Sequence, residues 1–165
     1  GENRMNSFVG YESPELIEGM KVRLNSISQS SGDFYSYSIT YKTENINTAL
    51  SIDNDAKGFD NTRLALMLAV YNFDIGLLLQ NSKKISTNKK DRGYIFSINR
   101  KLSDKSSIYF QNAKSNMKID DGEQRSFGYT YKINSKIKIF IHQSSRESSN
   151  KGKVDYISVG AEYKF

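Results

Sequence analysis

Runs of alternating apolar and polar residues recur along this chain of 165 residues every 28–33 residues. The repeats begin near Met5, Phe34, Thr62, Gly93, Ser126 and Asp155. Each holds a first run, a tight break, a second run and a looser polar loop, and such hairpins with alternating short and long connections are typical of a β-meander. No segment has the i, i+3, i+4 spacing of an amphipathic helix. The sequence therefore predicts an all-β chain, folded as one domain over residues 1–165, with ten full strands and a leading segment.

Two architectures fit this alternation. In the first half of one repeat, Leu64, Leu66 and Leu68 alternate with Arg63 and Ala65. A soluble β-barrel carrier would turn the apolar face inward, whereas an outer-membrane barrel turns it toward lipid and lines its lumen with the polar face.

Three features favour the membrane barrel. The runs last 9–12 residues, the length that a tilted strand needs to cross a bilayer. Charges fall in the middle of runs, where a dry core would not tolerate them. Aromatic residues cluster near run ends, as in interfacial girdles: Tyr35, Tyr37, Tyr41, Tyr71, Phe73, Tyr163 and Phe165. We therefore expect a transmembrane antiparallel up-and-down β-barrel of the outer-membrane type, with 10–12 strands.

The amino-acid composition limits the kinds of catalytic and metal site that the chain can form. The absence of cysteine excludes disulfides, cysteine-ligated zinc, iron–sulfur clusters and thiol catalysis, and a single histidine excludes multi-histidine metal sites. We therefore expect no cofactor. Lys and Arg number 24 against 18 Asp and Glu, which favours an anionic partner. The chain has no apolar run of transmembrane-helix length and begins with polar residues, so a signal peptide has been removed or the sequence is not a full translation product.

Charged residues at the polar positions of the runs are the candidate pore lining. The basic ones are Lys21, Arg23, Lys42, Arg63, Lys101, Lys132, Lys138 and Lys164. The acidic ones are Asp53, Asp74 and Glu162. A mainly cationic wall would raise the local concentration of anions and give a mild anion bias; the alternative is a merely solvated polar face. Ile27 and Ile95 also fall at polar positions, so the register there is less certain.

Three further clusters have ordinary explanations. His142 stands before serines, but a hydrolase would also require a carboxylate and an oxyanion hole nearby, and we do not expect an enzyme. The acidic segment 120–123 lacks the ligand spacing of an EF-hand. A basic loop could contact lipopolysaccharide or simply be solvated, and it lacks the interleaved aromatic residues of a nucleic-acid site. Its residues are Lys83, Lys84, Lys89, Lys90 and Arg92.

Both ends of the chain resemble known families. Residues 155–165 (DYISVGAEYKF) resemble the last strand of bacterial outer-membrane proteins. This resemblance implies that Tyr163 and Phe165 form the signal read by the barrel-assembly machinery. Residues 6–19 (NSFVGYESPELIEG) resemble the Tyr-Asp-Ser-Pro-Glu-Phe-x-Gly turn of general diffusion porins, and 127–133 and 159–163 match the strand style of that family.

The resemblance is to Gram-negative porins of the neisserial/β-proteobacterial type, and it implies a homotrimeric channel for passive diffusion of ions and small hydrophilic solutes, in contact with outer-membrane lipid and lipopolysaccharide. In that family the turn lies midway along a barrel of sixteen strands. The chain would then correspond to the C-terminal ten to eleven strands, or would form a reduced barrel of 10–12 strands. A non-conducting barrel or barrel fragment with a structural, adhesive or assembly-substrate role remains the alternative, with the soluble carrier third.

Overall fold

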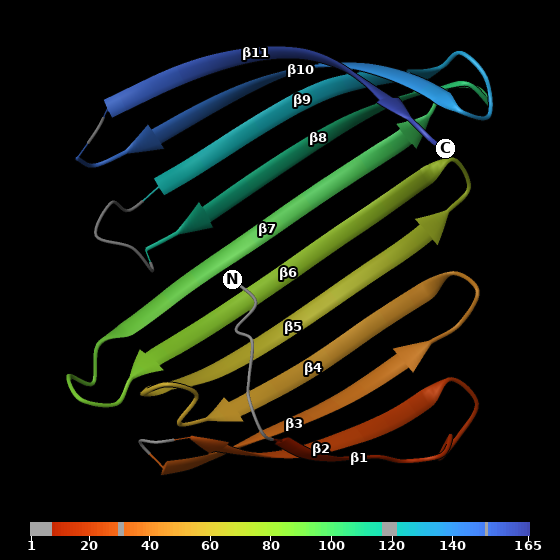
Figure 1. Ribbon diagram of the computed structural model, residues 1–165. Helices are drawn as coiled ribbons and strands as arrows, with labels where there is room; N and C mark the ends of the chain where they lie inside the picture. The colour runs from red at the N-terminus through yellow and green to blue at the C-terminus, as the bar shows by residue number, and fades with distance from the viewer. Residues whose placement is uncertain (1–7, 30–31, 117–121, 151) are drawn as a thin grey trace. The chain divides into compact units, whose positions relative to one another are not determined.

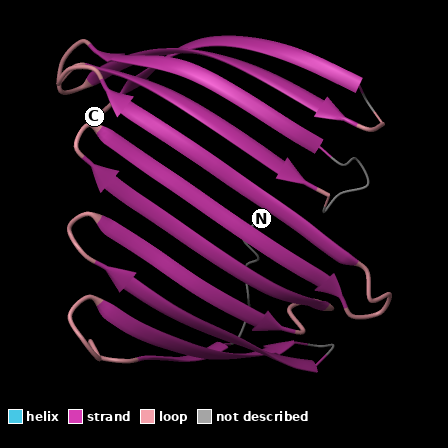
Figure 2. Cartoon of the chain, turned by 180° about the vertical axis from the view of Figure 1, so that it is seen from behind, coloured by secondary structure: helices cyan, strands magenta, loops and turns pink. Residues whose placement is uncertain are grey.

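The computed structural model describes residues 8–29, 32–116, 122–150 and 152–165. In these ranges eleven antiparallel strands form one sheet, in which each strand pairs with the next in sequence (Figure 1). The strands are β1 (Phe8–Glu12), β2 (Met20–Gln29), β3 (Gly32–Lys42), β4 (Ile46–Asn54), β5 (Phe59–Val70), β6 (Phe73–Lys84), β7 (Lys90–Lys101), β8 (Ser106–Ser115), β9 (Gly122–Lys132), β10 (Ile137–Ser148) and β11 (Gly152–Tyr163). The predicted all-β, up-and-down antiparallel fold is confirmed (Figure 2). Within the described residues, no helix is long and apolar enough to cross a membrane.

The observed strands start earlier than the alternation predicts. The strands predicted near Phe34, Thr62, Gly93, Ser126 and Asp155 begin two to four residues before those positions, while Met5 lies outside the described residues. The additional residues are mostly polar, since they follow the longer loops. Backbone pairing in a ladder does not depend on apolar side chains, so the strands extend beyond the part that the hydrophobic pattern reveals.

The chain divides into two compact units, and each is described by itself. The first comprises residues 1–66 and 78–92, and the second comprises 67–77 and 93–165. In the first unit, β2 pairs with β3 in a register that sets Lys21 opposite Thr40 and Arg23 opposite Ser38. In the second unit, β10 lies between β9 and β11. Because alternate residues of a strand point to opposite faces, each register sorts its side chains into an apolar face and a polar face.

The apolar face has no second layer packed against it within the described residues. On β3, Tyr35, Tyr37, Ile39 and Tyr41 are 37–47% exposed, and Val159 on β11 is 76% exposed. Among the described residues, the buried hydrophobic side chains are Ile27, Phe34 and Ala56. A soluble barrel of this length would bury its apolar face, so this exposure argues against the soluble carrier and matches a sheet solvated by lipid.

On the apolar face, apolar side chains occupy only part of the length of each strand, and polar side chains occupy the rest. On β10, Ile137, Ile139 and Ile141 are followed on the same face by Gln143 and Ser145. On β6 the apolar positions run from 73 to 79 and polar positions 81 and 83 follow. Seven residues span roughly 23 Å along a strand. The apolar part therefore begins at the tight turns and gives way to polar residues toward the longer loops, as expected of strands that continue beyond a bilayer.

The connection between β1 and β2 holds the Ser-Pro-Glu segment in a tight arrangement. The Ser13 amide donates to the Val22 carbonyl at 2.8 Å, and the Val22 amide donates to Ser13 Oγ at 2.9 Å. Gly19 has a φ of +78°, and a Cβ on it would lie 2.1 Å from the Lys42 carbonyl oxygen. Only glycine allows β2 and the end of β3 to approach this closely.

Candidate functional site

The polar face carries the charged residues predicted to line a pore. In the first unit, Lys21, Arg23, Lys42, Asp53 and Arg63 lie at polar-face positions of β2 to β5. In the second unit, the corresponding residues are Asp74, Lys101, Lys132, Lys138, Glu162 and, just after β11, Lys164. Ile27 and Ile95 lie on this face as well: Ile27 is opposite Phe34 and Ile95 is opposite Ala113. The alternation therefore does not slip at these two isoleucines.

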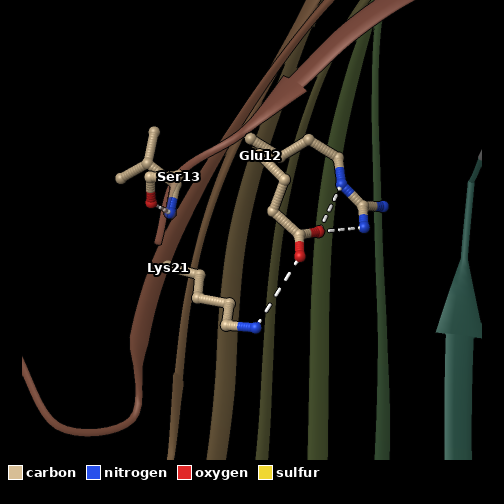
Figure 3. A network of polar contacts seen from close by, with 5 residues as sticks. Glu12, Ser13 and Lys21 are labelled. Atoms are coloured by element: carbon tan, nitrogen blue, oxygen red, sulfur yellow. Dashed lines mark hydrogen bonds and ion pairs between the residues drawn. The ribbon is translucent and has the colours of Figure 1, made fainter. Parts of the chain in front are cut away.

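Glu12 holds two of the predicted basic residues in one cluster. Its carboxylate accepts hydrogen bonds from Nε and Nη2 of Arg23, and its other oxygen lies 3.7 Å from Nζ of Lys21 (Figure 3). Arg23 is the cross-strand partner of Glu12 in the β1–β2 ladder. One carboxylate thus partly neutralises two cations on the polar face.

Asp74 has a similar role in the second unit. Asn99 Nδ2 donates to Asp74 Oδ2 at 3.1 Å, and Lys101 Nζ lies 4.0 Å from Asp74 Oδ1. Lys101 is 60% exposed at its side chain, so this ion pair is long and open to water. Such exposed pairs contribute little to stability, and their main effect is to reduce the local positive charge.

A third charged group spans β9 to β11. Lys138 Nζ lies 2.7 Å from Glu162 Oε2, and the register sets Lys138 opposite Lys132 on its other side. Lys132, Lys42, Arg63 and Lys164 make no side-chain salt bridge within 4.0 Å to any described residue. Among the residues predicted to line a pore, these four are therefore the basic ones without an ion pair in the described part of the chain.

The pattern analysis missed several residues of this face. Glu12 was visible only as part of the turn motif, although its position two residues after Gly10 places it on the polar face. Arg146 also lies on this face, opposite Gln124. Tyr109 and Phe140 were missed because aromatic residues suggest the apolar face. The parity of Ile137, Ile139 and Ile141 would have assigned Phe140 to the opposite face.

The other candidate clusters gain no chemical role. The His142 ring stacks on Phe140, with centroids 6.4 Å apart and planes inclined by 11°. Asp120 and Asp121 lie outside the described residues. No group of three or more metal-ligating His, Cys, Asp or Glu side chains occurs in the described ranges. The basic loop is closed by a hydrogen bond from the Lys84 amide to the Lys89 carbonyl.

The last aromatic residues of the chain lie close together and are highly exposed. Tyr163 and Phe165 make an edge-to-face contact with ring centroids 5.3 Å apart. Tyr163 is 54% exposed, and Phe165 is fully exposed. Nothing in the described part of the chain covers this pair, so its rings are available to lipid or to another protein.

No protein-family model and no curated protein sequence matches the chain. Solved structures do. The fold is similar to the anion-selective porin from Comamonas acidovorans, with a TM-score of 0.76, 13% identity, and coverage of 98% of this chain and 60% of that one. It is also similar to OmpT, an outer membrane protein of Vibrio cholerae, in its outer-membrane-expressed form, with a TM-score of 0.68, 11% identity, and coverage of 98% and 65%. A further porin structure matches with a TM-score of 0.67, 12% identity, and coverage of 94% and 60%.

These similarities show the fold of outer-membrane porin barrels. The chain spans less than two thirds of the length of these three proteins. At such low identity the shared property is the fold, a sheet of consecutive antiparallel strands.

Proposed function

We propose that this chain forms the wall of a passive, water-filled channel for ions and small hydrophilic solutes in a bacterial outer membrane. The observation that carries the proposal is the division of the sheet into two chemically opposite faces. One face exposes Tyr37, Ile39 and Val159 with no layer of described residues over them, while the other carries Arg63 within β5 and Lys132 at the end of β9. Lipid solvates the first face, and only water can solvate the second.

The channel needs no chemical step and no cofactor. Solutes are selected by the width of the lumen and by its charge. The cationic surplus favours anions, and we assign this preference to Lys42, Arg63, Lys132 and Lys164 rather than to the residues paired with Glu12, Asp74 and Glu162. The similarity to an anion-selective porin supports the same direction.

We also infer the assembly of the protein from the family that its turn and end motifs resemble. The neisserial/β-proteobacterial porins are trimers, so we propose a homotrimer. The exposed rings of Tyr163 and Phe165 are the proposed signal for the barrel-assembly machinery. Lipopolysaccharide is the proposed partner of the basic loop around Lys84 and Lys89.

The test is single-channel conductance of the protein, purified in detergent and added to a planar bilayer under a salt gradient. The proposal predicts discrete, ohmic current steps and a reversal potential displaced toward that of the anion. Variant Arg63→Gln should move the reversal potential toward the equilibrium potential of the cation. Arg100→Gln changes a residue on the opposite face of the sheet and should not move it. Folded, membrane-inserted protein that gives no current steps would contradict the channel and support a non-conducting barrel.

A further inference from the structure

Two glycines on the polar face of the second unit lie beneath aromatic rings. A Cβ on Gly128 would lie 2.4 Å from the ring of Tyr109, and a Cβ on Gly160 would lie 2.5 Å from the ring of Phe140. Gly128 is opposite Tyr109 in the β8–β9 ladder, and Gly160 is opposite Phe140 in the β10–β11 ladder. The Tyr109 ring therefore lies over β9 and the Phe140 ring over β11, because the glycines at these positions have no side chain.

His142 adds a third ring to this part of the polar face. It lies opposite Gly128 from the side of β10, and its ring is stacked on that of Phe140. Tyr109, Phe140 and His142 are each partly exposed. We call these three residues the aromatic shelf. Rings that lie flat on a sheet present their faces to the solvent, and such faces stack on planar solutes.

An ammonium group near the shelf makes no salt bridge within the described part of the chain. Phe140 is opposite Thr130, so Lys132, two residues further along β9 on the same face, is the diagonal neighbour of Phe140. Diagonal neighbours have Cα atoms about 7–8 Å apart, within the reach of a lysine side chain. Lys138, which is directly opposite Lys132, is engaged by Glu162 at 2.7 Å. Lys132 therefore offers an ammonium near Phe140 that makes no salt bridge with a described residue, while Glu162, the diagonal neighbour of Phe140 on β11, is engaged by Lys138.

We propose that the aromatic shelf and Lys132 form a binding site for planar aromatic carboxylates on the lumen side of the sheet. The solute ring stacks on one ring of the shelf, and its carboxylate pairs with Lys132. The inference rests on the proposed channel, since the site needs a water-filled lumen for access. It goes beyond general anion preference, because it distinguishes anions by their ring.

The test measures benzoate binding directly by saturation-transfer NMR on the detergent-folded protein, with empty micelles as the blank. Cyclohexanecarboxylate has the same charge without a planar ring, and benzyl alcohol has the ring without the charge. The site predicts that benzoate binds more tightly than either. Equal binding of cyclohexanecarboxylate and benzoate would overturn the stacking role.

Matched variants locate the site. Tyr109→Leu with Phe140→Leu removes two planar rings but keeps apolar bulk over the glycines, and it should weaken benzoate binding by about fivefold or more. Phe127→Leu with Tyr129→Leu removes the same two ring types from the apolar face of β9 and should leave binding unchanged.

Lys132→Gln should weaken the binding of benzoate but not that of benzyl alcohol, while Lys136→Gln in the following turn should affect the binding of neither. An equal loss in both double variants, or an unaffected Lys132→Gln, would overturn the site.

With these experiments the proposed channel and the proposed binding site can be contradicted independently of each other. Current steps without ring-dependent benzoate binding would contradict the site and leave the channel standing. Benzoate binding that follows the variants in a protein without current steps would contradict the channel and retain the site.

Discussion

Nζ of Lys138 lies 2.7 Å from Oε2 of Glu162, across the pairing of β10 with β11. On the other side of Lys138, the register brings Lys132 to the same level of the sheet. The three side chains form a short row on the polar face with one net positive charge. Removing single charges from this row therefore tests directly how the charge of the polar face affects ion selectivity.

Neutralising Glu162 and neutralising Lys132 should have opposite effects. Glu162→Gln leaves Lys138 without its carboxylate, so anion preference should rise; Lys132→Gln removes a cation, so it should fall. Each change should alter the local anion concentration by about twofold or less, because water and salt screen exposed charges. The double variant Lys138→Gln with Glu162→Gln keeps the net charge, so its reversal potential should equal that of the wild type. A displaced reversal potential in the double variant would show that the pair acts by more than its charge.

Glu12→Gln should free Lys21 and Arg23 together. We expect a stronger anion preference in the reversal potential and little change in thermal unfolding, because the cluster is exposed and such ion pairs contribute little to stability. Glu15→Gln, in the turn that follows β1, removes the same charge without disturbing the pairs. A similar selectivity change in both variants would mean that the cluster is not part of the lumen wall.

Gly19→Ala should destabilise the fold more than Gly58→Ala. Both glycines have a φ near +80°, which costs a side chain about 1 kcal/mol. Only at Gly19 would the new Cβ also meet a backbone oxygen, that of Lys42, whereas Gly58 has open space around it. We expect a loss of about 1 kcal/mol at Gly58 and more than about 2 kcal/mol at Gly19, measured by urea unfolding. Equal losses would contradict the close approach of Gly19 to the end of β3.

Leu50→Lys and Ser51→Lys place the same charge on opposite faces of β4. A lysine facing lipid near the middle of a bilayer costs about 2–4 kcal/mol, while one facing water costs little. Folding into lipid vesicles, followed by denaturant titration, should show that loss for Leu50→Lys alone. A larger loss for Ser51→Lys would mean that the two faces are reversed.

The sequence predicted the class of fold and the two faces because both depend on a period of two that runs through the whole chain. It located the strand starts less well, since polar residues such as Asp33 and Asn61 continue the ladder without an apolar signal. Residues such as Arg63 and Lys132 could be assigned to the polar face by parity alone. Whether a charge is free or paired could not be predicted, because it depends on the cross-strand register.

The aromatic shelf illustrates the same limit. Composition and run-end clustering suggested that aromatic residues belong to the lipid-facing side, and Tyr129 and Tyr131 fit that expectation. Tyr109 and Phe140 lie on the other face, where Gly128 and Gly160 make room for their rings. A glycine on one strand matched with a ring on the next is a relation between strands, and it becomes visible only when the register is known.

The central claim, that alternate residues face lipid and water, is tested most directly by single-cysteine scanning through β4. The chain has no cysteine, so each introduced thiol is unique. A charged, membrane-impermeant thiol reagent, applied to the protein in a planar bilayer, should react at Ala49, Ser51 and Asp53 and reduce the current, but not react at Thr48, Leu50 and Ile52. Reaction at every position, or faster reaction at Leu50 than at Ser51, would contradict the account.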